Sequence, residues 1–405
     1  MTILFDLSAT QPNSGNDFHG GSEYAKVVFY QLCKKLSETV QLEVFYNPDN
    51  VIDTALVSEC KSHSIIEYLC KNNRELNALL GKKQYDVFYT ALPYSYHDLN
   101  IPTKTKFIYT VHGLRSTEYP WDNFILKYKK QSFKTHIKQV ISLFFPNQWR
   151  EYLMRKSVNN FNLLFTRTKN QIVVTVSLHS KYAINYFFPH IDSSSIEALY
   201  SPAKLLQDDT VDEKAVLDGL TVEQGKYILL IGGDREEKGA YRACKALHKL
   251  FLTNNNNIPD NFKVIILGVS REKFYRKLTR NSPRFIFSNY VPSASLEALY
   301  KNAHLFMYPT LNEGFGYPPL EAMKYGTLCA CSANSAVTEI CAGAVLYFNP
   351  LDEIEMGIRV LESFDKSIRE QKASKMRKHF AEIHKKQDKD LGTLVDIIIG
   401  NIAKP

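Results

Sequence analysis

The sequence predicts an α/β protein of two domains, each folded around a doubly wound parallel sheet. The chain has 405 residues, which is too long for one ordinary domain. It is 44% hydrophobic and 23% charged, so each half can bury a core. Short apolar runs alternate with helix-length segments along the chain, and this alternation is typical of βαβ units.

Each expected strand is a short apolar run bounded by polar residues, Gly or Pro, as is usual for strands buried on both faces. In the first half these runs lie at residues 3–7, 42–46, 86–90, 107–111, 172–176 and 196–200. In the second half they lie at 227–231, 264–267, 285–287, 305–308, 328–331 and 345–348. Parallel strands place their carboxyl ends at one edge of the sheet, where ligands of such folds bind.

The domain boundary is expected near residues 202–226, where a polar and acidic stretch separates two strand candidates. We therefore expect an N-terminal domain at 1–205 and a C-terminal domain at 206–385. The chain is helical by pattern from about Asp365 onward, and residues 386–405 are expected to form a C-terminal helix whose apolar face at 390–399 packs back on the first domain.

The composition favours some partners and argues against others. A net charge of +8 is too moderate for a dedicated nucleic-acid arm, but it suits anionic phosphates or an anionic membrane face. The seven cysteines have irregular spacing without paired zinc ligands, so reduced thiols of a cytosolic protein are the better interpretation. The first residues resemble a strand rather than a signal peptide, and no apolar run is long enough to span a bilayer.

The most informative segment is residues 308–326, with the sequence YPTLNEGFGYPPLEAMKYG. A buried strand leads into a Gly-rich loop, two prolines suited to a first helical turn, and a short helix that stops at Gly326. A loop of this kind delivers backbone N–H groups to a helix N-terminus, which is a site for phosphate. Glu313 in the loop and Glu321 in the first helical turn can both accept hydrogen bonds from sugar hydroxyls.

This segment resembles the signature of the retaining nucleotide-sugar glycosyltransferases of family 4 (group 1), in which two glutamates are separated by seven residues. The flanking sequences SLEALYKNAHLFMYPT, SANSAVTEICAGAVLYFNPLD and LLIGGDREEKGAYRACKAL resemble the same family, as do TVHG and TVSLHSKYAI in the first half. The resemblance implies the GT-B fold, with two Rossmann-like domains facing across a cleft. It also implies that the first domain binds the acceptor and the second binds the donor.

The resemblance implies roles for individual residues of the second domain. Glu313 matches the glutamate that contacts the donor sugar near its reacting carbon, and Glu321 matches the one that binds the ribose. The diphosphate and sugar contacts fall on Gly314, Phe315, Gly316 and Lys238. In the first domain, Gly20 and Gly21 match a flexible loop that closes over the phosphates, and His112 matches a histidine near the donor sugar.

The phosphate clamp departs from the family pattern. An arginine is usual either six residues before the lysine or immediately before it, and here these positions hold Gly232 and Glu237. Arg235 is the nearest candidate replacement. No acidic metal-binding motif is convincing, because the D-x-D at 388–390 lies in a charged stretch expected to be a solvated surface. No metal or other cofactor is therefore expected.

Each candidate residue also has a purely structural interpretation. The two glutamates can be surface carboxylates, Lys238 and Arg235 solvated charges, His112 a core histidine, and the glycine pair an ordinary turn. The basic and apolar segment 124–145 can be either a partly buried helix or a patch that docks on a membrane surface.

The predicted function is hexosyl transfer, with retention and without a metal, from a nucleotide-diphosphate sugar to a hydroxyl of a glycan or lipid-linked acceptor. The setting is surface polysaccharide or glycolipid synthesis in the cytoplasm, with an anionic membrane surface as a further partner and no nucleic acid. The alternatives are a GT-B enzyme acting on soluble sugars and an inert GT-B module that binds sugar or a partner without turnover.

Overall fold

The computed structural model describes residues 1–12, 20–122, 124–125, 128, 133–205, 211–253 and 257–401, without the side chains of 133–136 and 139. It divides into two compact units. Unit 1 comprises residues 1–118, 153–205 and 384–405, and unit 2 comprises residues 119–152 and 206–383.

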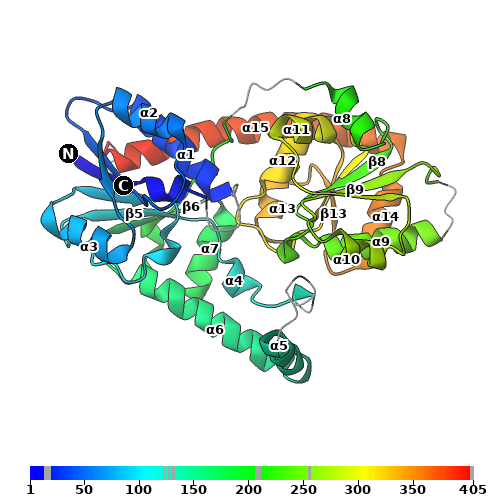
Figure 1. Cartoon of the computed structure of the whole chain (residues 1–405), viewed down its shortest axis with the longest axis horizontal. Helices are drawn as coiled ribbons and strands as arrows, with labels where there is room; N and C mark the ends of the chain where they lie inside the picture. The colour runs from blue at the N-terminus through cyan, green and yellow to red at the C-terminus, as the bar shows by residue number, and fades with distance from the viewer. Residues whose placement is uncertain are drawn as a thin grey trace. The chain divides into compact units, whose positions relative to one another are not determined.

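Unit 1 is built on a parallel sheet with the strand order β3-β2-β1-β4-β5-β6-β7 in its described residues. The strands are β1 (Thr2–Asp6), β2 (Gln41–Tyr46), β3 (Ile66–Leu69), β4 (Val87–Thr90), β5 (Lys106–Val111), β6 (Gln171–Thr175) and β7 (Ile196–Ala198). The helices and 3-10 turns are η1 (Leu7–Thr10), α1 (Gly20–Lys34), α2 (Thr54–Ser62), α3 (Asn73–Lys82), η2 (Pro93–Ser95), α4 (Arg115–Glu118), α6 (Pro146–Phe165), α7 (Leu178–Phe187) and η4 (Ser193–Ser195). The first turns of α6, up to residue 152, group with unit 2. Figure 1 shows α1 and α2 on the opposite side of the sheet from α3.

Unit 2 repeats this plan with the strand order β10-β9-β8-β11-β12-β13 in its described residues. The strands are β8 (Tyr227–Leu230), β9 (Lys263–Leu267), β10 (Phe285–Ser288), β11 (Leu305–Tyr308), β12 (Cys329–Ser332) and β13 (Leu346–Phe348). The helices are α5 (Phe133–Phe144), α8 (Glu213–Gly219), η5 (Glu236–Lys238), α9 (Ala240–Leu252), α10 (Glu272–Leu278), α11 (Ser293–Asn302), α12 (Tyr317–Lys324), α13 (Ser335–Cys341), α14 (Glu353–Glu362) and α15 (Lys366–Ile398). The helices α9, α10 and α14 cover one face of the sheet, and α8, α11 and α12 cover the other (Figure 1).

The cores follow from the apolar strands. In unit 1, alternate strand residues such as Phe88 and Phe107 pack against α3, α6 and α7. On the other face, Phe5 packs against Phe29 of α1 and Tyr89 of β4. The central strands are buried along their whole length, as in the segment Tyr227–Leu230 of β8, so the expectation of continuous apolar runs is correct.

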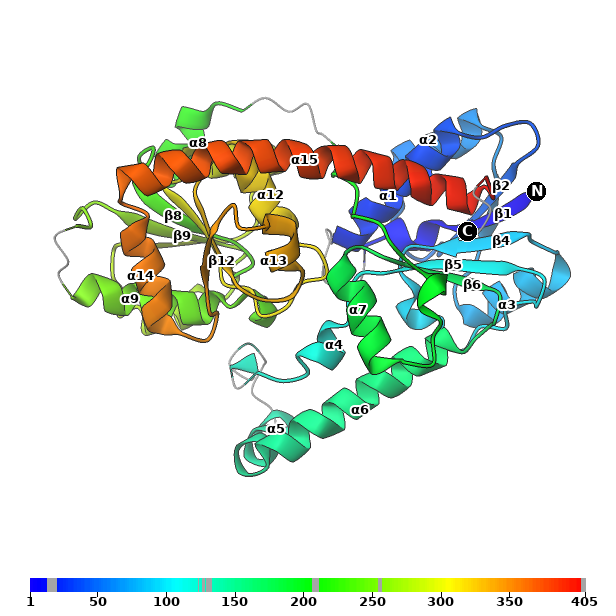
Figure 2. The same ribbon diagram turned by 180° about the vertical axis from the view of Figure 1, so that it is seen from behind.

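Two secondary-structure elements, β3 and α15, differ from the sequence expectation. Strand β3 was not expected, because Glu67 interrupts its apolar residues; it lies at the sheet edge, and its side chains are half-buried or exposed. Helix α15 is continuous from Lys366 to Ile398, as the helical pattern from about Asp365 predicts, so residues 386–398 continue this helix rather than form a separate one. Asp365 caps it by accepting from the backbone N–H groups of Ser367 and Ile368. Its last part groups with unit 1, where Gln387 donates to the Ser201 carbonyl at 2.6 Å. Figure 2 shows the helix along its whole length.

Residues 119–152 group with unit 2, although the expected N-terminal domain of 1–205 included them. The physical reason is a buried ion pair, in which the two terminal nitrogens of the Arg242 guanidinium donate to the Asp122 carboxylate, Nη1 at 2.8 Å. The backbone N–H of Tyr241 also donates to the Tyr128 hydroxyl at 3.1 Å. A bidentate Arg–carboxylate pair fixes geometry as well as charge, so it holds this segment on helix α9.

Candidate active site

The candidate site of unit 2 lies where the strand order reverses. Strands β8 and β11 are parallel neighbours, and the chain leaves them in opposite directions across the sheet. The carboxyl end of β8 leads to η5 with Lys238, and the carboxyl end of β11 leads to the loop with Glu313. Such a switch point is where open parallel sheets bind ligands.

The turn after β8 depends on a glycine. Gly239 has φ of 68°, a left-handed conformation that favours glycine, and ends η5 immediately after Lys238. A Cβ at this position would lie 2.0 Å from the carbonyl oxygen of Pro309, which follows β11. Only glycine therefore allows the two loops to approach so closely.

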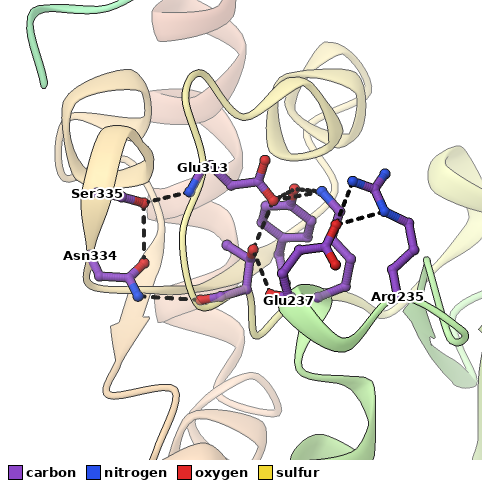
Figure 3. A network of polar contacts seen from close by, with 8 residues as sticks. Arg235, Glu237, Glu313, Asn334 and Ser335 are labelled. Atoms are coloured by element: carbon purple, nitrogen blue, oxygen red, sulfur yellow. Dashed lines mark hydrogen bonds and ion pairs between the residues drawn. The ribbon is translucent and has the colours of Figure 1, made fainter. Parts of the chain in front are cut away.

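The loop after β11 is held by backbone and side-chain hydrogen bonds from two neighbouring elements (Figure 3). The backbone N–H of Leu311 donates to the Glu237 carbonyl at 2.7 Å. On the other side, the backbone N–H of Glu313 donates to Ser335 Oγ at 2.9 Å, and Asn334 Nδ2 donates to the Leu311 carbonyl at 2.8 Å. Glu313 is thus fixed by η5 and by the start of α13.

The centre of the site is a nearly buried ion pair between Lys238 and Glu313. Glu313 Oε1 accepts from Lys238 Nζ at 2.5 Å, from the Tyr308 hydroxyl at 2.6 Å and from the Thr310 hydroxyl at 2.7 Å. The side chains of Lys238 and Glu313 are 9% and 15% exposed. The second oxygen of Glu313 points away from these donors (Figure 3), so it can accept from a bound molecule.

Each charge of this pair stabilises the charged form of the other residue. Burial acts to raise the pKa of Glu313, but the Lys238 charge and three hydrogen bonds prevail and lower it to about 2. For Lys238, burial lowers the pKa and Arg235 adds to this effect, while Glu313 acts to raise it. Glu313 is therefore a carboxylate at neutral pH, and it supplies the counter-charge of a buried ammonium group.

Protonation of Glu313 should destabilise the protein in acid. Because its folded pKa of about 2 lies below the ordinary 4.5, the stabilisation is fully present above pH 4.5 and is lost as the pH falls toward 2. The shift corresponds to roughly 3 kcal/mol of unfolding free energy. We expect the gap in urea midpoint between the wild type and Glu313→Gln to narrow between neutral pH and about pH 3. An equal gap at both pH values would contradict this assignment.

Arg235 lies beside the pair rather than within it. Its Nε donates to Glu237 Oε1 at 2.7 Å, and its side chain is 53% exposed. Burial acts to lower the pKa of Arg235, but the Glu237 carboxylate, and after it Glu313, keep this pKa raised. A half-exposed guanidinium next to Lys238 can reach a bound phosphate.

Glu321 and Glu313 are both hydrogen-bonded to tyrosines whose rings pack on the same residue of strand β11, Phe306. The Tyr300 hydroxyl donates to Glu321 Oε2 at 3.0 Å, as the Tyr308 hydroxyl does to Glu313. The two tyrosine rings are connected through Phe306, which contacts Tyr300 edge-on at 5.1 Å and stacks on Tyr308 at 5.8 Å. Helix α12 begins at Tyr317, so Glu321 opens the second helical turn, and its expected place in the first turn was wrong.

The glycine loop has the expected form. Gly316 has φ of 114° and stands at the N-cap of α12, Phe315 is buried against Tyr317, and Gly326 has φ of 73° directly after the helix. Because Pro318 and Pro319 lack N–H groups, the amide donors at this helix start are concentrated on residues 314–317. These amides lie in the same loop as Glu313.

Unit 1 holds the remaining candidates. His112 follows β5, and its Nε2 donates to the Ala91 carbonyl at 2.9 Å, while its ring contacts Tyr24 edge-on at 4.8 Å. This bond places the proton on Nε2 in neutral histidine. Gly20 and Gly21 form the start of helix α1 rather than a loop, and residues 13–19 before them lie outside the described residues.

Sequence reasoning missed the residues that position Glu313. Tyr308 and Thr310 stand within the analysed segment, yet they were assigned only to the strand and its exit. Ser335 and Asn334 come from a separate segment, and nothing in their spacing indicates contact with Glu313. Because side chains alternate along a strand, Phe306 and Tyr308 could have been placed on one face of β11. This was the only feature of the sequence that indicated where the Tyr308 side chain lies.

The described residues offer neither a metal site nor a membrane-spanning helix. They contain no group of three or more His, Cys, Asp or Glu side chains arranged to hold a metal ion. They also contain no helix with the length and hydropathy of a membrane span.

Comparison with known proteins supports a glycosyltransferase. Residues 214–386 match the family described as glycosyl transferases group 1. The O-antigen chain mannosyltransferase RfbU of Salmonella typhimurium is 25% identical over 250 residues, which are 60% of this chain and 57% of that relative. The match therefore spans less than two thirds of the length of RfbU.

Solved structures confirm the fold class. Sucrose-phosphate synthase from Thermosynechococcus elongatus superposes with a TM-score of 0.67 at 12% identity, over 99% of this chain and 100% of that one. WaaG, a glycosyltransferase involved in lipopolysaccharide biosynthesis, superposes with a TM-score of 0.62 at 14% identity, over 98% and 100%. At such identities the likeness shows the GT-B fold alone. With the family match, these findings support a group 1 glycosyltransferase.

Proposed function

We propose that the protein is a retaining glycosyltransferase of family 4, which moves a hexose from a nucleotide-diphosphate sugar to a hydroxyl of a glycan or lipid-linked acceptor. The observation that carries this proposal is the Lys238–Glu313 pair at the strand-order reversal, with one Glu313 oxygen directed away from its donors. The name of RfbU, an O-antigen chain mannosyltransferase, favours mannose as the sugar and surface polysaccharide synthesis as the setting. We place this synthesis at the cytoplasmic face of the membrane.

The proposed roles divide the site by charge. Lys238 and Arg235 stabilise the donor diphosphate, together with the backbone amides of Gly314, Phe315 and Gly316. Glu313 accepts from a sugar hydroxyl through its outward oxygen and keeps Lys238 in place through the other. In this proposal Glu321 accepts from the ribose hydroxyls, and Tyr300 orients its carboxylate.

The proposed chemistry breaks the bond between the sugar C1 and the diphosphate oxygen. Positive charge develops on the sugar and negative charge on the leaving phosphate, which the cationic side chains and amides stabilise. The acceptor hydroxyl attacks C1 from the face that the phosphate leaves, and its proton passes to the phosphate oxygen. The configuration at C1 is therefore retained, and the proposed step uses no metal. His112, Gly20 and Gly21 of unit 1 are assigned to the donor sugar and phosphates in this proposal.

A donor screen tests the function directly. A matching nucleotide sugar, such as GDP-mannose or UDP-glucose, should raise the melting temperature, because a ligand that binds the native state stabilises it in proportion to its affinity. With an acceptor, the same donor should release nucleoside diphosphate and give a product whose anomeric configuration, read by NMR, equals that of the donor. An inverted product would refute the retaining mechanism. Tight donor binding without nucleotide release under any acceptor would identify an inert binding module.

A further inference from the structure

Helix α5 presents an apolar stripe to solvent. Its residues Ile137, Val140, Ile141 and Phe144 follow the i, i+3, i+4, i+7 spacing of one helix face, and they are 43%, 47%, 37% and 75% exposed. In a globular protein such a face is normally turned to the core. Among the side chains of this helix that the structure describes, the buried one is that of the small polar Ser142. The amphipathic pattern of this helix is therefore turned outward.

The apolar surface continues past the end of α5. Leu143 is 69% exposed, and Phe145, between α5 and α6, is 57% exposed. Figure 2 shows α5 running directly into α6 at this point. A group of adjacent exposed aliphatic and aromatic side chains, unlike a single one, indicates a surface that meets an apolar partner.

The sequence that contains this stripe carries charge of one sign. From residue 123 to residue 150 the sequence contains no Asp or Glu, and its basic residues are Lys127, Lys129, Lys130, Lys134, Lys138 and Arg150. Of these, Lys138 and Arg150 are exposed in the described structure. Apolar side chains flanked by cations match the surface of an anionic bilayer, where acyl chains lie below negative headgroups.

We propose that α5 and the adjoining Phe145 bind the surface of an anionic lipid bilayer, so that the protein is a peripheral membrane protein. At 1.5 Å per residue, the 12 residues of α5 are about 18 Å long, which is too short to cross a hydrocarbon core of about 30 Å, so the helix lies in the interface. A second copy of the chain would be a poor partner for this surface, because two clusters of the same positive sign repel. The proposal does not require the reaction proposed above.

Vesicle sedimentation tests this proposal with the full chain. Wild-type protein should bind vesicles of phosphatidylglycerol and phosphatidylcholine, bind pure phosphatidylcholine vesicles much less, and lose binding as salt rises. Leu143→Glu with Phe144→Glu should lower the bound fraction about tenfold or more, because both side chains leave the interface and add repulsion. Replacing Lys127, Lys129 and Lys130, which lie outside the described residues, by Glu should also release the protein.

The matched control carries the same two charge changes at exposed apolar residues elsewhere, Val51→Glu with Ile354→Glu, at sites 75% and 77% exposed. It should bind vesicles like the wild type. Equal loss in the control would mean that net charge alone explains binding, and unchanged sedimentation of the α5 variant would overturn the proposal. A shift of the wild type to a dimer without lipid, abolished in the α5 variant, would identify a second copy as the occupant instead. Donor-induced thermal stabilisation should be unchanged in the α5 variant, which separates this outcome from failure of the proposed reaction.

Discussion

Glu313→Gln should lower kcat by about 10²–10³-fold or more while the protein stays folded, because the carboxylate is proposed to act on the reacting sugar and to hold Lys238 at the diphosphate. The amide keeps the size and one acceptor oxygen of the side chain but not its charge. The measurement is the initial rate of nucleotide release with donor and acceptor, with circular dichroism to verify the fold. A rate within a factor of two of the wild type would remove Glu313 from the mechanism.

The same substitution has a consequence for stability that identifies the ion pair. It leaves the Lys238 ammonium, 9% exposed, without its counter-charge, and breaking a buried pair in this way costs about 3–5 kcal/mol. Glu313→Gln combined with Lys238→Met removes both charges and should recover most of this loss, since replacing a buried pair by neutral groups is often close to neutral. Activity should stay lost in the double variant.

An exposed ion pair provides the control for this comparison of single and double substitutions. Glu272 and Arg276 pair across one turn of α10, and both side chains are 45% exposed. Glu272→Gln should change the unfolding free energy by less than about 1 kcal/mol, because solvent screens the pair. If the two single substitutions at Glu313 and Lys238 simply added in the double variant, their charges would not be coupled and the proposed role of the pair would fail.

The strands could be predicted from the sequence where burial is complete. The runs at 227–230, 264–267 and 305–308 are apolar because helices cover both faces of the sheet. The apolar run in the sequence is therefore enough to predict each of these strands. Strand β3 was missed because Glu67 interrupts its apolar residues, which leaves no continuous apolar run like those of the buried strands, although Ile66 and Tyr68 favour a strand. The grouping of 119–152 with unit 2 also escaped, since it depends on Asp122 meeting Arg242, 120 residues away.

The candidate site shows the same division between local and distant information. The glycine loop, the prolines and the stop at Gly326 are local features, and the structure has them where the sequence placed them. The acidic partner of Lys238 was not predicted, because that contact is made by chain segments 75 residues apart. Nor could the sequence show that Tyr308 and Thr310 share one oxygen of Glu313 and leave the other directed outward.

Gly239→Ala should be among the most damaging single-methyl changes in unit 2. The new Cβ would lie 2.0 Å from the Pro309 carbonyl oxygen, where no side chain can fit, and the residue would keep an unfavourable φ of 68°. Relief requires the η5 turn and the β11 loop to move apart, so we expect a loss of about 4 kcal/mol or more. Lys238 precedes this glycine, so its ammonium would also shift from Glu313, and such a displacement can lower the rate about 10²-fold.

The matched control is Gly225→Ala, because Gly225 has nearly the same backbone conformation, with φ of 71°, and open space where a Cβ would stand. Its cost should be that of the left-handed conformation alone, about 1–2 kcal/mol, with the transfer rate unchanged. The difference in urea midpoint between the two variants therefore measures the close approach of the two loops. Equal destabilisation would mean that Gly239 is needed for its backbone angle only. In that case the close approach of Gly239 to Pro309 would not be the contact that places Lys238 beside Glu313.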